Sequence, residues 1–425
     1  MHRALTSFVS VVMFVLGCGW ALAHPMPNSL IDLEVGETSI AARLTIPLIE
    51  LGLALQRGLS GDATALTAAD KALVAQYIAA HTAVATPDGA AWTIAIDDVS
   101  IVVDHSVGPY ADAVVLMTLA PPEGTSVRHF TLNYDAVLGR VVTHAAVVSV
   151  HQDWFSGQIE GGETLGVIQV NPVNGVVAPL AVSLSEGSYW YGFVSTLGLG
   201  ASHIAEGTDH LLFLLTLLLP APLLAAGGRW KAQASMRATL VSIATIVTAF
   251  TVGHSIALLV ATLYRLQLPQ QPIEVLIALT ILVSAIHALH PIFPKRVPLV
   301  AGIFGLIHGM AFSFTLVNLN LSTPQLIISL LGFNLGIEFF QLALVASIMP
   351  ALLLFARSRV CGPVRTIGAV VATAASLGWG ADRMGWSSLV AEIVDGAGQQ
   401  LPWIICGLTL LALLVWWQAH QSRLP

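Results

Sequence analysis

Hydrophobic and polar residues follow two different patterns along the chain, and the change comes near residue 186. From His24 to about Ser185, short β-rich runs are separated by turn residues such as Asp88-Gly89. One helical pattern, about Ala65–His81, interrupts them. The runs predict seven strands, at Ile31–Val35, Ile40–Ile46, Trp92–Val103, Ala113–Leu119, Arg128–Tyr134, Arg140–Val150 and Gly166–Val170. We expect a small, mainly β domain of the sandwich type.

Long apolar segments dominate the rest of the chain, and several approach the ~20 residues that cross a bilayer core. Seven are predicted to be transmembrane helices, at about 201–223, 238–264, 272–290, 298–318, 325–355, 364–380 and 400–417. Hydrophobic residues make up 56% of the sequence and charged ones 10%, against about 25% charged in soluble domains. The fold class is therefore an α-helical polytopic membrane protein preceded by an extracytoplasmic β-rich domain. A net charge of −7 argues against nucleic-acid binding.

The first 23 residues have the pattern of a secretory signal peptide. Arg3 supplies the positive start, Phe8–Leu16 the apolar stretch, and Ala21–Ala23 a small-residue cleavage site. That stretch is too short to span a membrane, and acylation at Cys18 is the alternative to ordinary cleavage. We therefore expect a signal peptide at 1–23, an extracytoplasmic β-rich domain at 24–185 and a transmembrane helical domain at 186–425.

The distribution of basic residues predicts the orientation. If the β-rich domain is exported, the first helix runs inward and seven helices leave the C-terminus in the cytoplasm. Nine basic residues then fall in the cytoplasmic loops and tail: Arg229, Lys231, Arg237, Lys295, Arg296, Arg357, Arg359, Arg365 and Arg423. The outer loops carry only Arg265 and Arg383. This bias fits the positive-inside rule and predicts a multi-pass protein of the bacterial inner membrane with a periplasmic N-terminal domain.

Ionisable side chains interrupt the apolar segments, where they are costly unless they find partners and mark functional sites by default. The densest group runs from His203 to His210 and leads into Leu211–Leu219. In the predicted orientation most of these groups lie at the outer to middle depth of the membrane, while His287 and His290 lie at the inner end. The predicted metal site contains His203, Glu206, Asp209, His210, His254, His308, Asn334 and Glu338. The alternative is that these residues only hydrogen-bond to one another between helices.

Helical spacing refines the first motif. On one continuous helix, His203 and His210 would share a face, with Glu206 within roughly 60° of both. Asp209 would point about 100° away from His210, a position suited to orienting a ligand. Gly207 and Gly309 would let helices approach closely, as small residues do in membranes.

The pattern His203-x5-Asp209-His210 resembles the signature of the HupE/UreJ family of nickel and cobalt permease-like proteins. Three further sequence segments strengthen the resemblance: Gly253-His254-Ser255, Phe304-Gly-Leu-Ile-His308-Gly309 and Phe333-Asn334-Leu-Gly-Ile-Glu338. They look like the branch that carries an exported N-terminal domain. The resemblance covers about 190–355 well and implies that His203, Asp209 and His210 take part in metal selection or passage.

The chain departs from the second motif of the family, Phe-His-Gly-x-Ala followed by His-Gly-x-Glu. His308 matches the first histidine, but Phe312 replaces the second histidine, Thr315 the glutamate and Ile307 the leading phenylalanine. Glu338 is a candidate substitute from another helix. The departure bears on nickel specificity more than on metal binding.

These observations predict transport of a divalent transition metal, with Ni²⁺ or Co²⁺ favoured and Zn²⁺ or Cu²⁺ as alternatives. No Gly-x4-Gly-Lys-[Ser/Thr] motif occurs, so the chain itself offers no ATP-binding loop of that kind. Two other functions remain open: an intramembrane zinc hydrolase that uses His203, His210 and His254 or His308, and a membrane-anchored metal-binding or assembly accessory protein. Expected partners are the metal ion, the lipid bilayer, and a metalloenzyme maturation system or other membrane subunits.

Signal cleavage would create a second candidate metal site. His24 would become the first residue and present its amine and imidazole together, a chelate that suits copper or nickel. Additional ligands are available from His105, His129, His144 and His151. Surface histidines beside an ordinary cleavage site are the alternative interpretation.

Overall fold

The computed structural model describes residues 28–59, 65–104, 110–159, 161–264, 266, 268–319, 321–358, 360–398 and 400–421. The predicted signal peptide at 1–23 and His24 lie outside these residues. The chain divides into two compact units. The N-terminal unit comprises residues 1–151 and 162–184, and the helical unit comprises residues 152–161 and 185–425.

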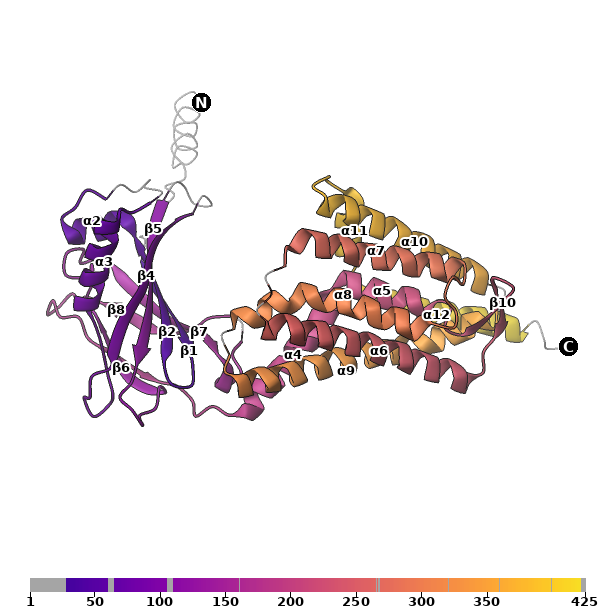
Figure 1. The fold of residues 1–425 in the computed structure, drawn as a ribbon, viewed down its shortest axis with the longest axis horizontal. Helices are drawn as coiled ribbons and strands as arrows, with labels where there is room; N and C mark the ends of the chain where they lie inside the picture. Colours follow the sequence, from indigo (N-terminus) through magenta and orange to yellow (C-terminus); the bar gives the residue numbers. More distant parts are fainter. Residues whose placement is uncertain are drawn as a thin grey trace, which may run out of the picture. The chain divides into compact units, whose positions relative to one another are not determined.

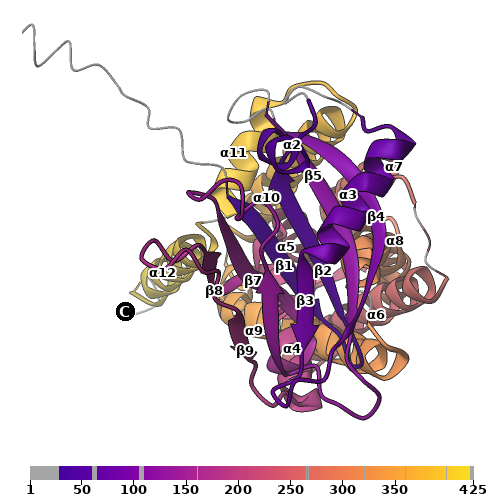
Figure 2. The ribbon, with the colours of Figure 1, turned by 90° about the vertical axis from the view of Figure 1, so that its left-hand side faces the viewer.

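The N-terminal unit contains two β-sheets and two helices (Figure 2). The larger sheet has the strand order β4-β5-β2-β1-β7-β8 and the smaller one the order β3-β6-β9. The strands are β1 (Ser29–Val35), β2 (Ile40–Pro47), β3 (Thr82–Ala85), β4 (Thr93–Asp104), β5 (Tyr110–Ala120), β6 (His129–Tyr134), β7 (Ala145–Asp153), β8 (Glu163–Gln169) and β9 (Leu180–Ser183). The helices are α2 (Leu48–Leu55) and α3 (Ala68–Ala80). All seven predicted runs contain strands, and the helical pattern becomes α3.

Buried and exposed residues alternate along the strands of this unit, and the buried ones form its core. In β2, Ile40, Leu44 and Ile46 are fully buried, whereas Arg43, which lies between them in sequence, is exposed. The helices add Leu48 and Leu51 from α2, and Val74 and Ile78 from α3, to the same hydrophobic cluster. The sequence did not predict β3, β9 or α2, because each has only four to eight residues.

A polar row crosses the core of the N-terminal unit. The ring of His144 contacts the Glu50 carboxyl group through Nδ1 and the Ser29 hydroxyl through Nε2, the latter at 2.8 Å. Ser29 and His144 are fully buried, and burial raises the pKa of Glu50. A serine–histidine–acid row also occurs in hydrolases, but the buried Ser29 hydroxyl is out of reach of a substrate. The row therefore ties the start of β1 to α2 and to the residue that precedes β7.

The helical unit is built from nine described helices and one hairpin (Figure 1). The helices are α4 (Tyr189–Glu206), α5 (Thr208–Leu218), α6 (Met236–Leu263), α7 (Gln270–Leu289), α8 (Val297–Asn318), α9 (Thr323–Ala356), α10 (Cys361–Arg383), α11 (Leu389–Gly398) and α12 (Leu401–Gln421). The hairpin pairs β10 (Leu223–Ala226) with β11 (Arg229–Gln233). Within the described residues, α6, α7 and α9 are long and apolar enough to cross a membrane. The pair Leu389–Gly398 and Trp403–Val415, bent by 77°, would make a fourth span, and seven spans remain a prediction.

The predicted first transmembrane helix, 201–223, is wrong in its bounds and its continuity. The helical segment begins at Tyr189, breaks at Gly207 and ends at Leu218, after which β10 begins. Gly207 has φ −73° and ψ 88°, so it is both the C-cap of α4 and the N-cap of α5. His203 and His210 therefore lie on two different helices, and the shared-face argument from continuous helical spacing does not apply.

Glycines bring two helix pairs into backbone contact. A Cβ atom at Gly253 of α6 would overlap the carbonyl oxygen of Gly302 on α8, and one at Gly305 would overlap that of Phe250. A Cβ at Gly336 of α9 would likewise overlap the carbonyl oxygen of Leu197 on α4. Such close approach is typical of small residues at helix interfaces in membranes. It fixes α6 against α8 and α4 against α9, the four helices from which most of the polar site arises.

The segment 152–161 belongs to the helical unit, although it lies within the sequence of the predicted β-rich domain. Trp154 is 1% exposed, donates from Nε1 to Ser329 Oγ at 2.7 Å and packs against Gly192. Gln152 also donates to the carbonyl oxygen of Leu319 at 2.8 Å. These contacts anchor the segment to α4, α9 and the end of α8.

Candidate metal centre

Four helices bring four histidines together: His203 at the end of α4, His210 in the first turn of α5, His254 on α6 and His308 on α8. The ring centroids of His203 and His210 lie 4.8 Å apart, as do those of His210 and His308, and His203 and His254 are separated by 6.1 Å. Two sets of side chains place one ligand atom per residue within 4.8 Å of one another. The first is His203, His210 and His254, and the second is Asp209, His210 and His308.

Three of the four histidines are buried and His203 is half-buried, yet most of the ring nitrogens lack hydrogen-bond partners among the described residues. His210 is 5% exposed, and His254 and His308 are fully buried. Among the described residues, no partner reaches His203 Nε2, His210 Nε2, His308 Nδ1 or either ring nitrogen of His254. An unsatisfied buried polar group costs about 1–3 kcal/mol. Hydrogen bonding between the helices therefore accounts for only part of the cluster.

Neighbouring polar groups orient two of the rings. Asp209 Oδ1 accepts hydrogen bonds from the backbone N–H of His210 at 2.8 Å and from its Nδ1 at 2.9 Å. The Thr280 hydroxyl on α7 donates its single hydrogen to the carbonyl oxygen of Ile277 at 2.7 Å, so it accepts from His308 Nε2 at 3.0 Å. Protons at these positions leave lone pairs on His210 Nε2 and His308 Nδ1. Such support is what metal-ligating histidines usually have.

Aromatic rings form an apolar wall beside the cluster. Phe312 of α8 lies 4.3 Å from the His203 ring and stacks on Phe333 of α9 at 4.4 Å, with 13° between the planes. Phe250 approaches His308 to 5.3 Å. Phe312 occupies the position where the family motif has its second histidine, so an apolar surface replaces a ligand there. The side chain of Thr315, the other departure, lies outside the described part of the structure.

Three of the predicted ligands lie outside both sets. Glu206 is exposed, and Glu338 Oε1 accepts from the Thr248 hydroxyl at 3.1 Å. Asn334 lies beside the His254 ring, but its Oδ1 accepts from Ser255 at 2.6 Å and its Nδ2 donates to the Leu330 carbonyl oxygen at 2.7 Å. Asn334 thus borders the cluster, and Glu338 lies one helical turn further along α9.

The remaining histidines lie elsewhere. His287 stacks on Phe293 at 3.8 Å, and His290 is exposed at the C-cap of α7. In the N-terminal unit, His129 Nδ1 contacts the Ser183 hydroxyl at 3.1 Å, and His151 is exposed on β7. Neither His129, His144 nor His151 belongs to a set of metal-ligand geometry within the described residues. His24 and His105 lie outside those residues.

A pocket of about 760 Å³ opens onto the cluster. Its lining includes His203, Asp209, His210 and Phe312 together with Glu274 at the start of α7. Trp379, Arg383, Asp395 and Gly398, from α10 and α11, line the same pocket. No sequence motif predicted Thr280, Trp379 or Asp395. A signal for Thr280 was available, because Thr280 and Ser284 are polar residues at i, i+4 spacing in an apolar helix.

A family model described as HupE / UreJ protein matches residues 181–388. The match confirms the family resemblance predicted from the histidine motifs and covers α4 to α10. No curated protein and no solved structure matches the chain significantly. Over residues 181–388 the chain is thus similar to HupE / UreJ proteins, a family associated with the membrane and with nickel or cobalt handling.

Proposed function

We propose that this protein carries a divalent transition metal of the Ni²⁺/Co²⁺ class across the bacterial inner membrane through the histidine cluster. The observation that carries the proposal is the set of five buried imidazole nitrogens that have no partner among the described residues. Imidazole nitrogen is a ligand that nickel, cobalt, zinc and copper all favour. A metal ion at the cluster would satisfy these nitrogens and remove the cost of burying them.

The spacing of the ligand atoms supports temporary binding. Around a tetrahedral ion with bonds of about 2.1 Å, donor atoms lie roughly 3.4 Å apart. In each set the donors lie within 4.8 Å of one another, so side-chain movements of about 1 Å would close either set around an ion. A transport site has to release its ion, and incomplete preorganisation favours release over permanent retention.

His210 belongs to both sets and therefore links them. An ion held by His203, His210 and His254 would exchange its other ligands for Asp209 and His308 as it passes. The second set adds a carboxylate, which offsets part of the charge of a dication in a low-dielectric environment. A membrane potential of 100 mV, negative inside, would favour inward movement of a dication by roughly 4–5 kcal/mol. Asp209 and Glu338 are candidate groups for proton coupling.

In the alternative hydrolase, Asp209, Glu338 or Ser255 would handle the proton, and the hydrogen bonds of Ser255 do not support such a role for it. Ser255 Oγ lies 2.7 Å from the carbonyl oxygen of Thr251 and 2.6 Å from Asn334 Oδ1, and both are acceptors for its single hydrogen. The hydroxyl is thus used in the packing of α6 against α9. The other alternative, a membrane-anchored metal-binding or assembly accessory protein, would bind metal but give no metal uptake.

Metal uptake by cells that express the full chain tests the proposal. We expect accumulation of radiolabelled Ni²⁺ or Co²⁺ with the wild type and near-background accumulation with His203→Ala/His210→Ala. His290→Ala is the matched control, because His290 is exposed and lies outside both sets. Equal uptake by the double variant contradicts transport through the cluster. If metal stoichiometry is retained as well, the hydrolase becomes the better explanation.

A further inference from the structure

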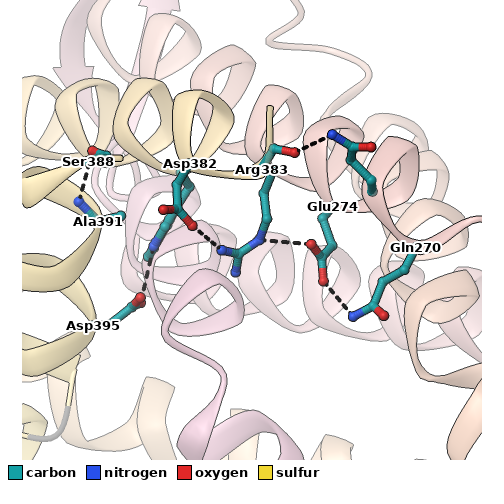
Figure 3. A network of polar contacts seen from close by, with 9 residues as sticks. Gln270, Glu274, Asp382, Arg383, Ser388, Ala391 and Asp395 are labelled. Atoms are coloured by element: carbon teal, nitrogen blue, oxygen red, sulfur yellow. Dashed lines mark hydrogen bonds and ion pairs between the residues drawn. The ribbon is translucent and has the colours of Figure 1, made fainter. Parts of the chain in front are cut away.

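One arginine that lines the pocket has two carboxylate partners (Figure 3). Arg383, at the end of α10, contacts Glu274 Oε2 through Nε at 2.9 Å and Asp382 Oδ2 through Nη1 at 2.8 Å. The other oxygen of this carboxylate, Glu274 Oε1, accepts a hydrogen bond from Gln270 Nε2 at 2.7 Å. Glu274 and Arg383 line the pocket, whereas Asp382 is not among its lining residues. Of the two partners of Arg383, Glu274 therefore lines the pocket and Asp382 does not.

Arg383 is a positive charge in a pocket whose described lining is mainly acidic. Four carboxylates line the pocket, from Glu206, Asp209, Glu274 and Asp395, and Arg383 is the basic residue that lines it. A cleft with an excess of negative charge concentrates cations and speeds their arrival. The same pocket reaches His210, whose Nε2 is buried and has no partner among the described residues. Arg383 and His210 therefore line one and the same pocket.

We propose that the Arg383–Glu274 pair is a charge gate that admits divalent cations to the histidine cluster. The inference rests on the proposed transport function. In the closed arrangement, which the structure contains, Arg383 occupies the Glu274 carboxylate and repels an arriving dication. In the open arrangement, Arg383 gives up Glu274, keeps its contact with Asp382, and the freed Glu274 carboxylate receives the incoming ion. The Arg383 guanidinium thus pairs with the Glu274 carboxylate until the metal ion binds there.

The surrounding contacts hold the backbone in place while the arginine side chain moves. Gln271 Nε2 donates to the carbonyl oxygen of Arg383 at 2.7 Å and ties the end of α10 to α7. Trp379 Nε1 donates to Asp395 Oδ1 at 3.1 Å and ties α10 to α11. The side chains of Arg383 and Asp382 are 36% and 40% exposed, so a movement of the guanidinium from both partners to Asp382 alone needs little desolvation. The gate therefore requires no movement of helices.

The rate of Co²⁺ binding to the purified full chain in detergent tests the gate, with stopped-flow absorbance as the readout. Arg383→Gln is expected to bind roughly three- to tenfold faster than wild type, because the repelling charge is gone. Glu274→Gln is expected to bind more slowly, with an unchanged final Co²⁺ spectrum. Asp382→Asn removes the alternative partner but keeps the Arg383–Glu274 pair, and is expected to bind about two- to fivefold more slowly. Arg383→Lys keeps the charge and is the control for its removal.

The outcomes separate the gate from the transport proposal. If wild-type protein gives no Co²⁺ spectrum of nitrogen coordination, the proposed function fails. If it gives that spectrum, and Arg383→Gln and Asp382→Asn both bind at the wild-type rate, the gate is overturned and the ion pair is only structural. Should Arg383→Gln not fold, Asp382→Asn decides alone, because it leaves the interhelical ion pair intact: slower binding supports the gate, and an unchanged rate overturns it.

Discussion

Phe312 shows how one side chain changes the chemistry of the cluster. Its ring lies 4.3 Å from His203 and packs flat on Phe333, so it closes one side of the site with an apolar surface. The HupE/UreJ motif has a histidine at this position. The chain thus has three buried histidines and one half-buried histidine from four helices, and an aromatic wall where a further imidazole would stand.

Replacing Phe312 by histidine is expected to add a ligand. An imidazole at this position would lie next to His203, and we expect Phe312→His to bind Ni²⁺ at least about tenfold more tightly than wild type. Isothermal titration of the purified protein in detergent measures the change. Phe312→Leu is the control, because it removes the ring without adding a nitrogen. Equal affinities of the histidine and leucine variants would show that position 312 does not face the bound metal.

Glu50 makes the stability of the N-terminal unit depend on pH. Burial raises the pKa of Glu50 above its ordinary value of 4.5, so the folded state favours the protonated form. The stabilisation from this protonation is complete below pH 4.5 and is lost as pH rises through the raised pKa. We expect the thermal transition of this unit to fall over that interval in wild type and to fall less in Glu50→Gln. Calorimetry of the full chain at several pH values measures it, and parallel curves would contradict the assignment.

At the scale of elements, the break between α4 and α5 creates the central pair of the site. The break turns the end of one helix toward the start of the next, so His203 and His210 face each other with ring centroids 4.8 Å apart. Asp209 lies in the first turn of α5 and orients His210 from there. A carboxylate is also favourable at this end of a helix, where unpaired backbone N–H groups carry partial positive charge.

Gly207→Ala tests whether the break sets the geometry of the site. A Cβ at residue 207 would lie 2.8 Å from His210 Nδ1 and 3.2 Å from Asp209 Oδ1. We expect the substitution to displace this pair and to weaken Co²⁺ affinity about tenfold or more, as other losses of ligand support do. Gly198→Ala on α4 is the matched control, because its Cβ would meet no atom within 4 Å. Equal affinities of the two variants would contradict the role of the break.

Sequence patterns predicted elements better than their junctions. The strands β1, β2, β4 and β5 follow clear alternation or long apolar runs, and their predicted bounds lie within a few residues of the observed ones. The break at Gly207 was not predicted, because apolar residues continue on both sides and an isolated glycine is tolerated within a helix. Asp209 was predicted to be suited to orienting a ligand, and in the structure it contacts His210 Nδ1. The prediction assumed one continuous helix, whereas the helix breaks at Gly207.

At the scale of the whole molecule, the helical unit includes a segment that precedes it by about thirty residues. Composition placed the boundary between domains near residue 185, where the long apolar segments begin. Composition could not assign the segment 152–161 to the helical unit, because the segment is polar and short. Its attachment depends on Trp154 fitting against a glycine, a relation between distant residues that no local pattern expresses.

Trp154→Ala is expected to destabilise the helical unit by about 3–5 kcal/mol, because the substitution empties a fully buried site. It also leaves Ser329 without the indole donor. The measurement is the thermal unfolding of the full chain in detergent. Trp190→Ala is the control, since Trp190 is 65% exposed. A truncated protein that begins at residue 186 should show a similar loss, and wild-type stability of both would contradict the assignment of this segment.

The convergence of polar residues from separate helices was predictable from the sequence, but the exact membership was not. Depth in the membrane follows from helix order and direction, which is why His203, His254 and His308 were expected together. Glu206 and Glu338 have suitable chemistry and depth, yet Glu206 is exposed in the pocket and Glu338 accepts from Thr248, and neither belongs to the two ligand sets. The direction that a side chain takes around its helix depends on packing, and the close approach of α6 to α8 through glycines fixes it for His254 and His308.

The proposed transport depends on binding of a divalent transition metal by the histidine cluster. This binding is tested by the visible absorption spectrum of the purified full chain in detergent, titrated with Co²⁺ and compared with that of His210→Ala/His254→Ala. We expect the wild type to show the intense bands of nitrogen-coordinated Co²⁺ and to saturate at about one ion per chain. The double variant should lack those bands. Identical spectra for both proteins, or no binding by the wild type, would contradict the account.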